Sequence, residues 1–171
     1  GGVEYDPYSG GTLETEILGL IVNGEITDSA GRGDKVQVVT AATCFYIEAG
    51  GEVSDTGWIR TPSGQLRVEE TQRPVPGLIV HSGEMVSGGF QTGQLAQLEV
   101  DDHRRGDIRR NHTATHVLHK ELRAHLGTHV TQAGSLVAPD RLRFDFSHGQ
   151  AVDRETLGKI ETAINEAVLA D

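Results

Sequence analysis

The hydrophobic pattern of this chain first changes from the period of a strand to that of a helix close to Asp102. Before that point apolar and polar residues alternate, so that Ala96, Leu98 and Val100 would share one face of an extended strand. After it, apolar residues recur at the spacing of an amphipathic helix. We therefore expect a β-rich domain over residues 1–102 and a mixed domain over residues 103–171.

Glycine divides the first part into short antiparallel strands. The chain has 22 glycines in 171 residues, well above the usual share of roughly 7%, and most of them precede Asp102. Asn23-Gly24 is a strong signal for a tight hairpin turn, and Ser87-Gly88-Gly89 predicts another. The pattern predicts a small closed antiparallel barrel. Its expected strands are Leu13–Val22, Glu25–Thr27, Lys35–Val39, Trp58–Arg60, Gln65–Glu69, Leu78–Met85 and Gln94–Asp101.

One glycine-rich segment, Ala49-Gly50-Gly51, is too flexible for the interior of a strand. It suits a turn, a bulge or the close approach of another backbone. A phosphate-binding loop is disfavoured, because neither a lysine nor a helix start follows the glycines.

The second part predicts a helix, a hairpin and a second helix, which makes the whole chain α+β. The first helix includes Arg109–Leu126 and ends at Gly127, a residue suited to a left-handed cap. The expected strands are Thr128–Val137 and Leu142–Phe146, with Gln132 in mid-strand. The final helix begins after Asp153, the expected N-cap. The residues at core-packing spacing are Leu118, Leu122 and Leu126 in the first helix and Leu157, Ile160, Ile164 and Val168 in the second.

Two histidines one helical turn apart, His112 and His116, can direct their imidazoles at a single metal ion. His119 falls on the same face, because the three residues span about 60° of arc. The zinc-protease pattern is excluded, since it needs Glu directly after the first His and this chain has Thr113 there. The pair alone also fits half-buried, hydrogen-bonded helix histidines. Surface or structural positions are expected for His81, His103, His125, His129 and His148.

Net charge and cysteine content restrict the classes of function that this chain can have. A formal net charge of −10 argues against unaided tight binding to a polyanion. The single Cys44 cannot form an internal disulfide, and it is expected to be a small, half-buried strand residue rather than a reactive thiol or a ligand. No signal segment or long apolar run occurs, so we expect a cytoplasmic location.

Two long runs carry a resemblance to a known family. RRNHTATHVLHKELRAHLGTHVTQAGSLVAPDRLRFDFSH, Arg109 to His148, resembles the start of the editing domain of alanyl-tRNA synthetase. TCFYIEAGGEVSDTGWI, Thr43 to Ile59, is similar to that family's barrel motif T-x-F-Y-x-E-x-G-G-Q-x-x-D-x-G. The chain departs from the family at Glu52, where the motif has Gln, and at Cys44, where Pro is common. The family's downstream C-x-x-x-H zinc motif is absent, so we interpret the chain as an internal piece.

The resemblance implies hydrolysis of tRNA(Ala) that has been mischarged with serine or glycine. By position in the motif, His112 and His116 would bind zinc, and Thr115 and Gln132 would line the catalytic pocket. The alternatives are a helix threonine bonded to its own backbone and a glutamine in solvent. His119 is not a ligand in the family pattern. Zinc is expected in the parent protein and weakly bound or absent in this piece, which alone should be inactive.

The implied partners are the acceptor end of tRNA(Ala), reached mainly through the parent protein, and neighbouring domains of the same chain. Aminoacylation and ATP binding would belong to other parts of that parent ligase. The arginine cluster is either a solvated face or a local contact with the tRNA backbone; its members are Arg104, Arg105, Arg109 and Arg110. The alternative function is a non-catalytic barrel and scaffold module that positions tRNA and neighbouring domains.

Overall fold

The computed structural model describes residues 2–170 and divides into two compact units. The first unit holds the chain up to Ala49 together with Ser54–Arg105, and the second holds Gly50–Val53 and the chain from Gly106 onward. The predicted split after Asp102 places residues 50–53 in the first part, whereas the structure assigns them to the second unit. No helix within the described residues is both long and apolar enough to cross a membrane.

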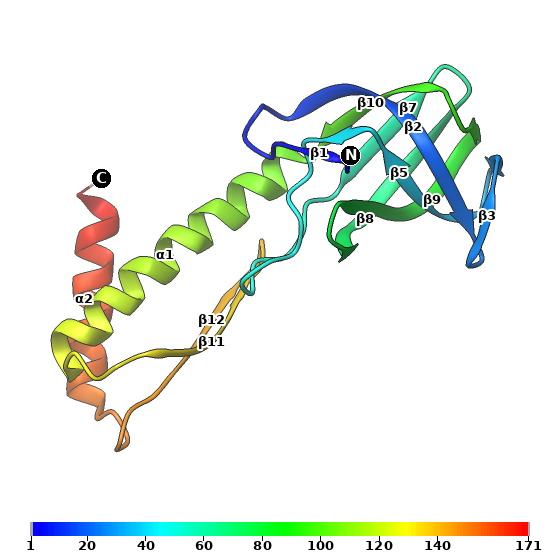
Figure 1. Ribbon diagram of the computed structural model, residues 1–171. Coiled ribbons are helices and arrows are strands. Elements are labelled where there is room, and N and C mark those ends of the chain that lie inside the picture. Colours follow the sequence, from blue (N-terminus) through cyan, green and yellow to red (C-terminus); the bar gives the residue numbers. More distant parts are fainter. Residues whose placement is uncertain (1, 171) are drawn as a thin grey trace. The chain divides into compact units, whose positions relative to one another are not determined.

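Antiparallel strands of the first unit close into the predicted barrel (Figure 1). The hydrogen-bonded order is β10-β7-β8-β9-β5-β2, and pairing of β10 with β2 completes the ring. Short strands attach to it: β3 (Glu25–Thr27) pairs with β2, β4 (Ser29–Gly31) pairs with β9, and β1 (Glu4–Tyr5) runs parallel to β6 (Ala42–Thr43). The barrel strands are β2 (Thr12–Val22), β5 (Lys35–Thr40), β7 (Gly57–Thr61), β8 (Gly64–Val75), β9 (Leu78–Gln91) and β10 (Leu95–Val100).

Alternate residues of these strands fill the barrel interior. Ala96, Leu98 and Val100 are all buried, as their shared face predicts. In a strand, successive side chains point to opposite sides, so one regular alternation supplies both the core and the solvated surface. The largest buried side chains of this core are Ile17, Leu20, Phe45, Ile59, Leu66, Met85, Phe90 and Leu98.

The predicted turn at Ser87-Gly88-Gly89 is wrong, because β9 continues through these residues to Gln91. Gly88 lies opposite Gly64 of β8, and a Cβ atom added to Gly88 would lie 1.9 Å from the carbonyl oxygen of Ser63. Glycine at this position permits a close approach between neighbouring strands. Glycine is favoured both in a turn and at such a close approach, so its presence in the sequence does not distinguish the two.

The second unit contains most of helix α1 (Asp102–Leu126), the hairpin of β11 (Gln132–Val137) and β12 (Leu142–Phe146), and helix α2 (Arg154–Leu169). Its core confirms the predicted leucine stripe of α1, because Leu122 is buried and its two neighbours in the stripe pack beside it. The other core residues are Val130, Phe144, Phe146, Ile160 and Ile164.

Helix α2 begins as predicted and packs less completely than predicted. The carboxylate of Asp153 accepts a hydrogen bond of 2.9 Å from the amide of Thr156, which is the expected N-cap. Of the predicted stripe, Ile160 is buried, but Leu157 and Val168 are exposed. The expectation that the whole stripe lies in a core is therefore wrong for its two ends.

Candidate metal centre

A short segment from between the barrel strands pairs with β11 inside the second unit. The amide of Val137 donates to the carbonyl of Gly51 at 2.7 Å, and the amide of Val53 donates to the carbonyl of Val137 at 3.1 Å. Gly51 has a φ of 87°, and a Cβ atom there would lie 2.2 Å from the carbonyl oxygen of Ser135. Of the expected roles of this segment, the close approach of another backbone is confirmed at Gly51, and residues 50 and 51 also form a turn.

Replacing Gly51 by alanine should loosen this pairing by about 1–3 kcal/mol, through the positive φ and the clash with Ser135 together. Native-state hydrogen exchange at the amides of Val53 and Val137 measures the loss. Gly50→Ala is the matched control, because Gly50 also has a positive φ, 62°, while no atom lies within 4 Å of its added Cβ. Equal effects of the two substitutions would contradict a role for the close approach.

The imidazoles of His112 and His116 face each other across one turn of α1. Their Nε2 atoms are 2.9 Å apart, and their ring centroids are 4.9 Å apart. Two nitrogens bound to one tetrahedral zinc at about 2.0–2.1 Å would lie about 3.3 Å apart, so a small rotation of either ring suffices to admit the ion. The pair therefore fits two ligands of a zinc site.

The other ring nitrogen of His112 has a carboxylate partner. Nδ1 of His112 contacts Oε2 of Glu52, whose side chain is only 13% exposed. Both residues belong to the second unit, because Glu52 lies in the segment that pairs with β11. Glu52 is one of the two positions where this chain departs from the family motif, and it is the one that touches the histidine pair.

The structure places the two predicted pocket residues in different environments. Thr115 is buried, and its hydroxyl donates to the carbonyl of Asn111 at 2.8 Å, the backbone bond named as its alternative. Gln132 is exposed and is the first residue of β11, so the mid-strand position expected for it is wrong. The strand starts later than predicted because residues 128 and 129 form a turn. The catalytic roles of both residues stay predictions.

His119 does not join the pair to form a recognisable metal site. Its Nε2 atom is buried without a hydrogen-bond partner, and its ring lies 5.0 Å from that of Phe144. Within residues 2–170, no group of three or more His, Cys, Asp or Glu side chains is arranged to hold a metal ion. Any zinc at His112 and His116 thus needs ligands beyond those that the described structure brings together.

Two barrel residues with reactive side chains are structural. His81 is fully buried; its Nδ1–H donates to the carbonyl of Val38 at 3.1 Å, and Nε2 accepts from the hydroxyl of Thr43 at 2.8 Å. Burial lowers the pKa of His81 to about 4. Cys44 lies after strand β6 and is fully buried, so the expected half-buried strand position is wrong. Burial also raises the pKa of the Cys44 thiol, which disfavours the reactive thiolate.

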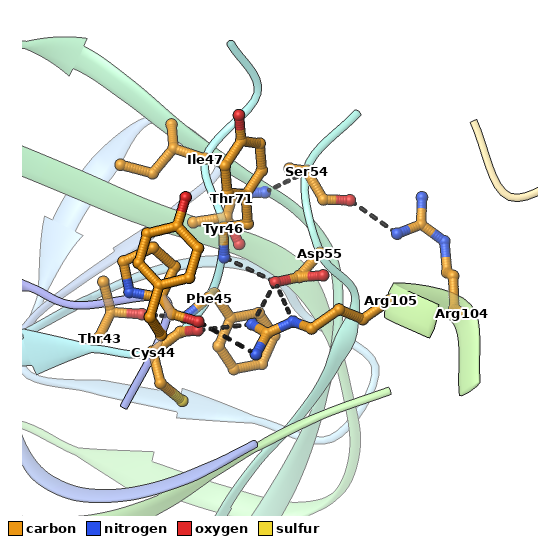
Figure 2. A network of polar contacts seen from close by, with 12 residues as sticks. Thr43, Cys44, Phe45, Tyr46, Ile47, Ser54, Asp55, Thr71, Arg104 and Arg105 are labelled. Atoms are coloured by element: carbon orange, nitrogen blue, oxygen red, sulfur yellow. Dashed lines mark hydrogen bonds and ion pairs between the residues drawn. The ribbon is translucent and has the colours of Figure 1, made fainter. Parts of the chain in front are cut away.

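The first two arginines of the predicted cluster hold the barrel unit together (Figure 2). The guanidinium of Arg105 binds the buried carboxylate of Asp55 and donates to the carbonyl of Cys44 at 2.7 Å. That carboxylate also accepts from the amide of Tyr46 at 2.7 Å. Arg104 donates to the carbonyl of Ser54 at 2.7 Å. For Arg105, neither a solvated face nor a nucleic-acid contact describes the observed role.

The other two members of that cluster lie in the second unit. Arg109 and Arg110 are exposed, and Arg110 forms an ion pair with Asp107. A contact of either arginine with tRNA stays a prediction.

The structure also brings together a second histidine pair that sequence spacing does not reveal. Nε2 of His129 lies 2.9 Å from Nδ1 of His148; His129 is exposed and His148 is half-buried. They flank the open end of the β11–β12 hairpin, beside a 2.7 Å hydrogen bond between the hydroxyls of Thr131 and Ser147. Only the register of that hairpin could have indicated this pair.

Comparison with known proteins defines the class first. Residues 3–104 match the family model of the tRNA synthetases class II (A), and the chain therefore belongs to that family. Within it, the chain is 54% identical over 161 residues to the alanine–tRNA ligase of Anaeromyxobacter sp. (strain Fw109-5), a match that covers 94% of this chain and 18% of the relative. Identity to the alanine–tRNA ligase of Chloroflexus aurantiacus is 51% over 155 residues, or 91% of this chain and 17% of the relative.

These matches confirm the predicted resemblance to alanyl-tRNA synthetase. The chain spans less than a fifth of the length of these two relatives. The family model covers the barrel and ends close to the start of α1, while the two ligases extend the similarity over almost the whole chain.

Proposed function

We propose that this chain forms the barrel and the first part of the editing domain of an alanine–tRNA ligase. Its second unit would contribute to hydrolysis of tRNA(Ala) carrying serine or glycine. The observation that supports this most strongly is the convergence of the Nε2 atoms of His112 and His116 at 2.9 Å on a helix of a chain about half identical to alanine–tRNA ligases.

In this proposal His112 and His116 would hold zinc through Nε2. Further ligands would come from the C-x-x-x-H motif that the family resemblance implies. Bound zinc would polarise a water or anchor the 3′ end of the tRNA. Thr115 and Gln132 would shape a pocket that admits nothing larger than serine, the task of a second sieve. Binding of tRNA, ATP-dependent ligation and a cytoplasmic location would be properties of the parent protein.

A non-catalytic barrel and scaffold module is the second candidate. It is favoured by one observation: the described residues contain no complete group of three metal-binding side chains. The two functions differ in whether the histidine pair matters to any reaction.

In a full-length ligase carrying this sequence, His112→Ala and His116→Ala should each lower deacylation of Ser-tRNA(Ala) by about tenfold or more, since each removes a zinc ligand. Aminoacylation with alanine should be unchanged, because it uses a separate site. Single-turnover deacylation and aminoacylation assays on the same preparations measure both.

His125→Ala is the matched control, because His125 lies on the same helix and faces Glu121 at 3.9 Å. Deacylation that survives both substitutions in the pair would favour the scaffold function. Equal loss of both activities would indicate a folding defect instead.

A further inference from the structure

We propose that Glu52 is a positioning residue that fixes the tautomer and the orientation of His112, so that Nε2 is presented to the face shared with His116. The part of this inference that concerns zinc rests on the proposed function. The part that concerns the imidazole is a property of the metal-free chain.

The backbone of Glu52 is anchored on both sides. The residues on either side, Gly51 and Val53, both hydrogen-bond to Val137, at 2.7 and 3.1 Å. These bonds hold a parallel bridge between Glu52 and Val137 of β11. Because Gly51 admits no side chain against Ser135, the segment lies directly on the hairpin backbone. Glu52 is thus fixed at its main chain, unlike a glutamate on a free loop.

The contact between Glu52 and His112 determines which ring nitrogen of His112 carries the proton. The Glu52 side chain is 13% exposed, and a carboxylate removed from water needs a hydrogen-bond donor. Nδ1 of His112 is that donor. An ionised carboxylate can only accept hydrogen bonds, so a neutral His112 must carry its proton on Nδ1. Its Nε2 atom then carries no proton and presents a free lone pair.

The Nε2 lone pair of His112 faces His116. The two Nε2 atoms are 2.9 Å apart, which is a hydrogen-bond distance and requires one proton between them. With His112 protonated on Nδ1, that proton belongs to His116. The metal-free pair therefore holds opposite tautomers, Nδ1–H on His112 and Nε2–H on His116.

To hold a metal ion through both Nε2 atoms, His116 would carry its proton on Nδ1 instead of Nε2, because a neutral imidazole ligates through its unprotonated nitrogen. His112 would need no such change, since its Nε2 already presents a free lone pair. Histidine ligands commonly donate their second ring N–H to a carboxylate, which sets the tautomer and raises ligand basicity. Glu52 would perform this role from a segment that is 60 residues from His112 in the chain.

The test begins with long-range proton–nitrogen NMR of the ¹⁵N-labelled chain without metal, at pH 8.5. The expected result is His112 protonated on Nδ1 and His116 protonated on Nε2. Glu52→Ala should remove the Nδ1–H tautomer of His112, whereas Glu52→Gln should keep it, because the amide oxygen still accepts from Nδ1. Glu52→Met retains the side-chain length without an acceptor and replaces Glu52→Ala if the alanine variant loses the pairing with β11.

Glu121→Ala is the matched control, since Glu121 faces His125 on the same helix and its loss should leave His112 unchanged. Titration with Zn²⁺, followed through the same ring signals, should show binding weakened about 10- to 100-fold by Glu52→Ala, less by Glu52→Gln and not by Glu121→Ala.

An unchanged His112 tautomer in both Glu52→Ala and Glu52→Met would overturn the proposal. The expected tautomers without any response to Zn²⁺ would uphold the role of Glu52, because this chain alone is expected to bind zinc weakly or not at all; the zinc site of the proposed function is then decided by the deacylation assay in the full-length ligase. Zinc binding that is equal in all variants, with the tautomer altered, would overturn the claim that Glu52 prepares His112 for the metal.

Discussion

Replacing Arg105 by methionine should destabilise the barrel unit by about 3–5 kcal/mol, because it leaves the carboxylate of Asp55 buried without its cation. The Asp55 side chain is 3% exposed and that of Arg105 is 16% exposed, so water cannot take the place of the guanidinium. The substitution also removes the donor to the carbonyl of Cys44. Urea denaturation followed by the fluorescence of Trp58, a residue of β7, measures the loss.

Two comparisons separate this effect from loss of packing. The double variant Asp55→Asn/Arg105→Met should be more stable than Arg105→Met alone, since it carries no unpaired buried charge. Lys35→Met removes only exposed ion pairs, with Glu69 and Glu84, because the lysine side chain is 62% exposed, and it should lower the stability far less than Arg105→Met. An Arg105→Met variant as stable as Lys35→Met would refute a structural role for the buried pair.

The barrel should also lose stability as the pH falls from about 6.5 to about 4, because His81 stays neutral when folded. Burial lowers its folded pKa to about 4 from an ordinary value of 6.5. Between these values the unfolded chain binds a proton that the folded chain does not, so stability is full above pH 6.5 and decreases toward pH 4. The loss attributable to His81 should reach about 3 kcal/mol.

Urea denaturation at half-unit steps of pH measures this loss. His81→Gln is the informative comparison, since an amide can still bond to Thr43 or Val38 and does not titrate. The difference between the two proteins isolates His81 from the carboxylates that titrate in the lower part of the range. Parallel pH profiles would show that His81 contributes nothing.

The sequence predicted the barrel well, because its strands need only local alternation. Each face of strands such as Leu95–Val100 is encoded by neighbouring residues, and closure follows from the number and spacing of the strands. The incorrect predictions concern glycines that permit close contact between backbone segments distant in the sequence. Gly88 allows a close approach rather than a turn, and Gly51 allows its segment to lie directly against the backbone of the hairpin.

The candidate site was predictable to the extent that one helix encodes it. His112 and His116 are four residues apart, so helical geometry alone brings them together. Glu52 is 60 residues from His112 in the chain. Its contact with His112 depends on the bridge between Glu52 and Val137, which no local sequence pattern predicts. The pairing of His129 with His148 and the structural role of Arg105 also depend on contacts between distant segments, and for that reason the sequence did not predict them.

The second unit is a discontinuous domain, since Gly50–Val53 are separated from the rest of it by more than fifty residues of barrel. A peptide that starts at Gly106 would therefore be an incomplete folding unit, with the N–H and C=O of Val137 exposed at the edge of its hairpin. Open strand edges promote self-association. Adding a synthetic peptide that spans residues 48–56 in trans should restore the bridge between Glu52 and Val137, which offers a route to reconstituting this domain from two pieces.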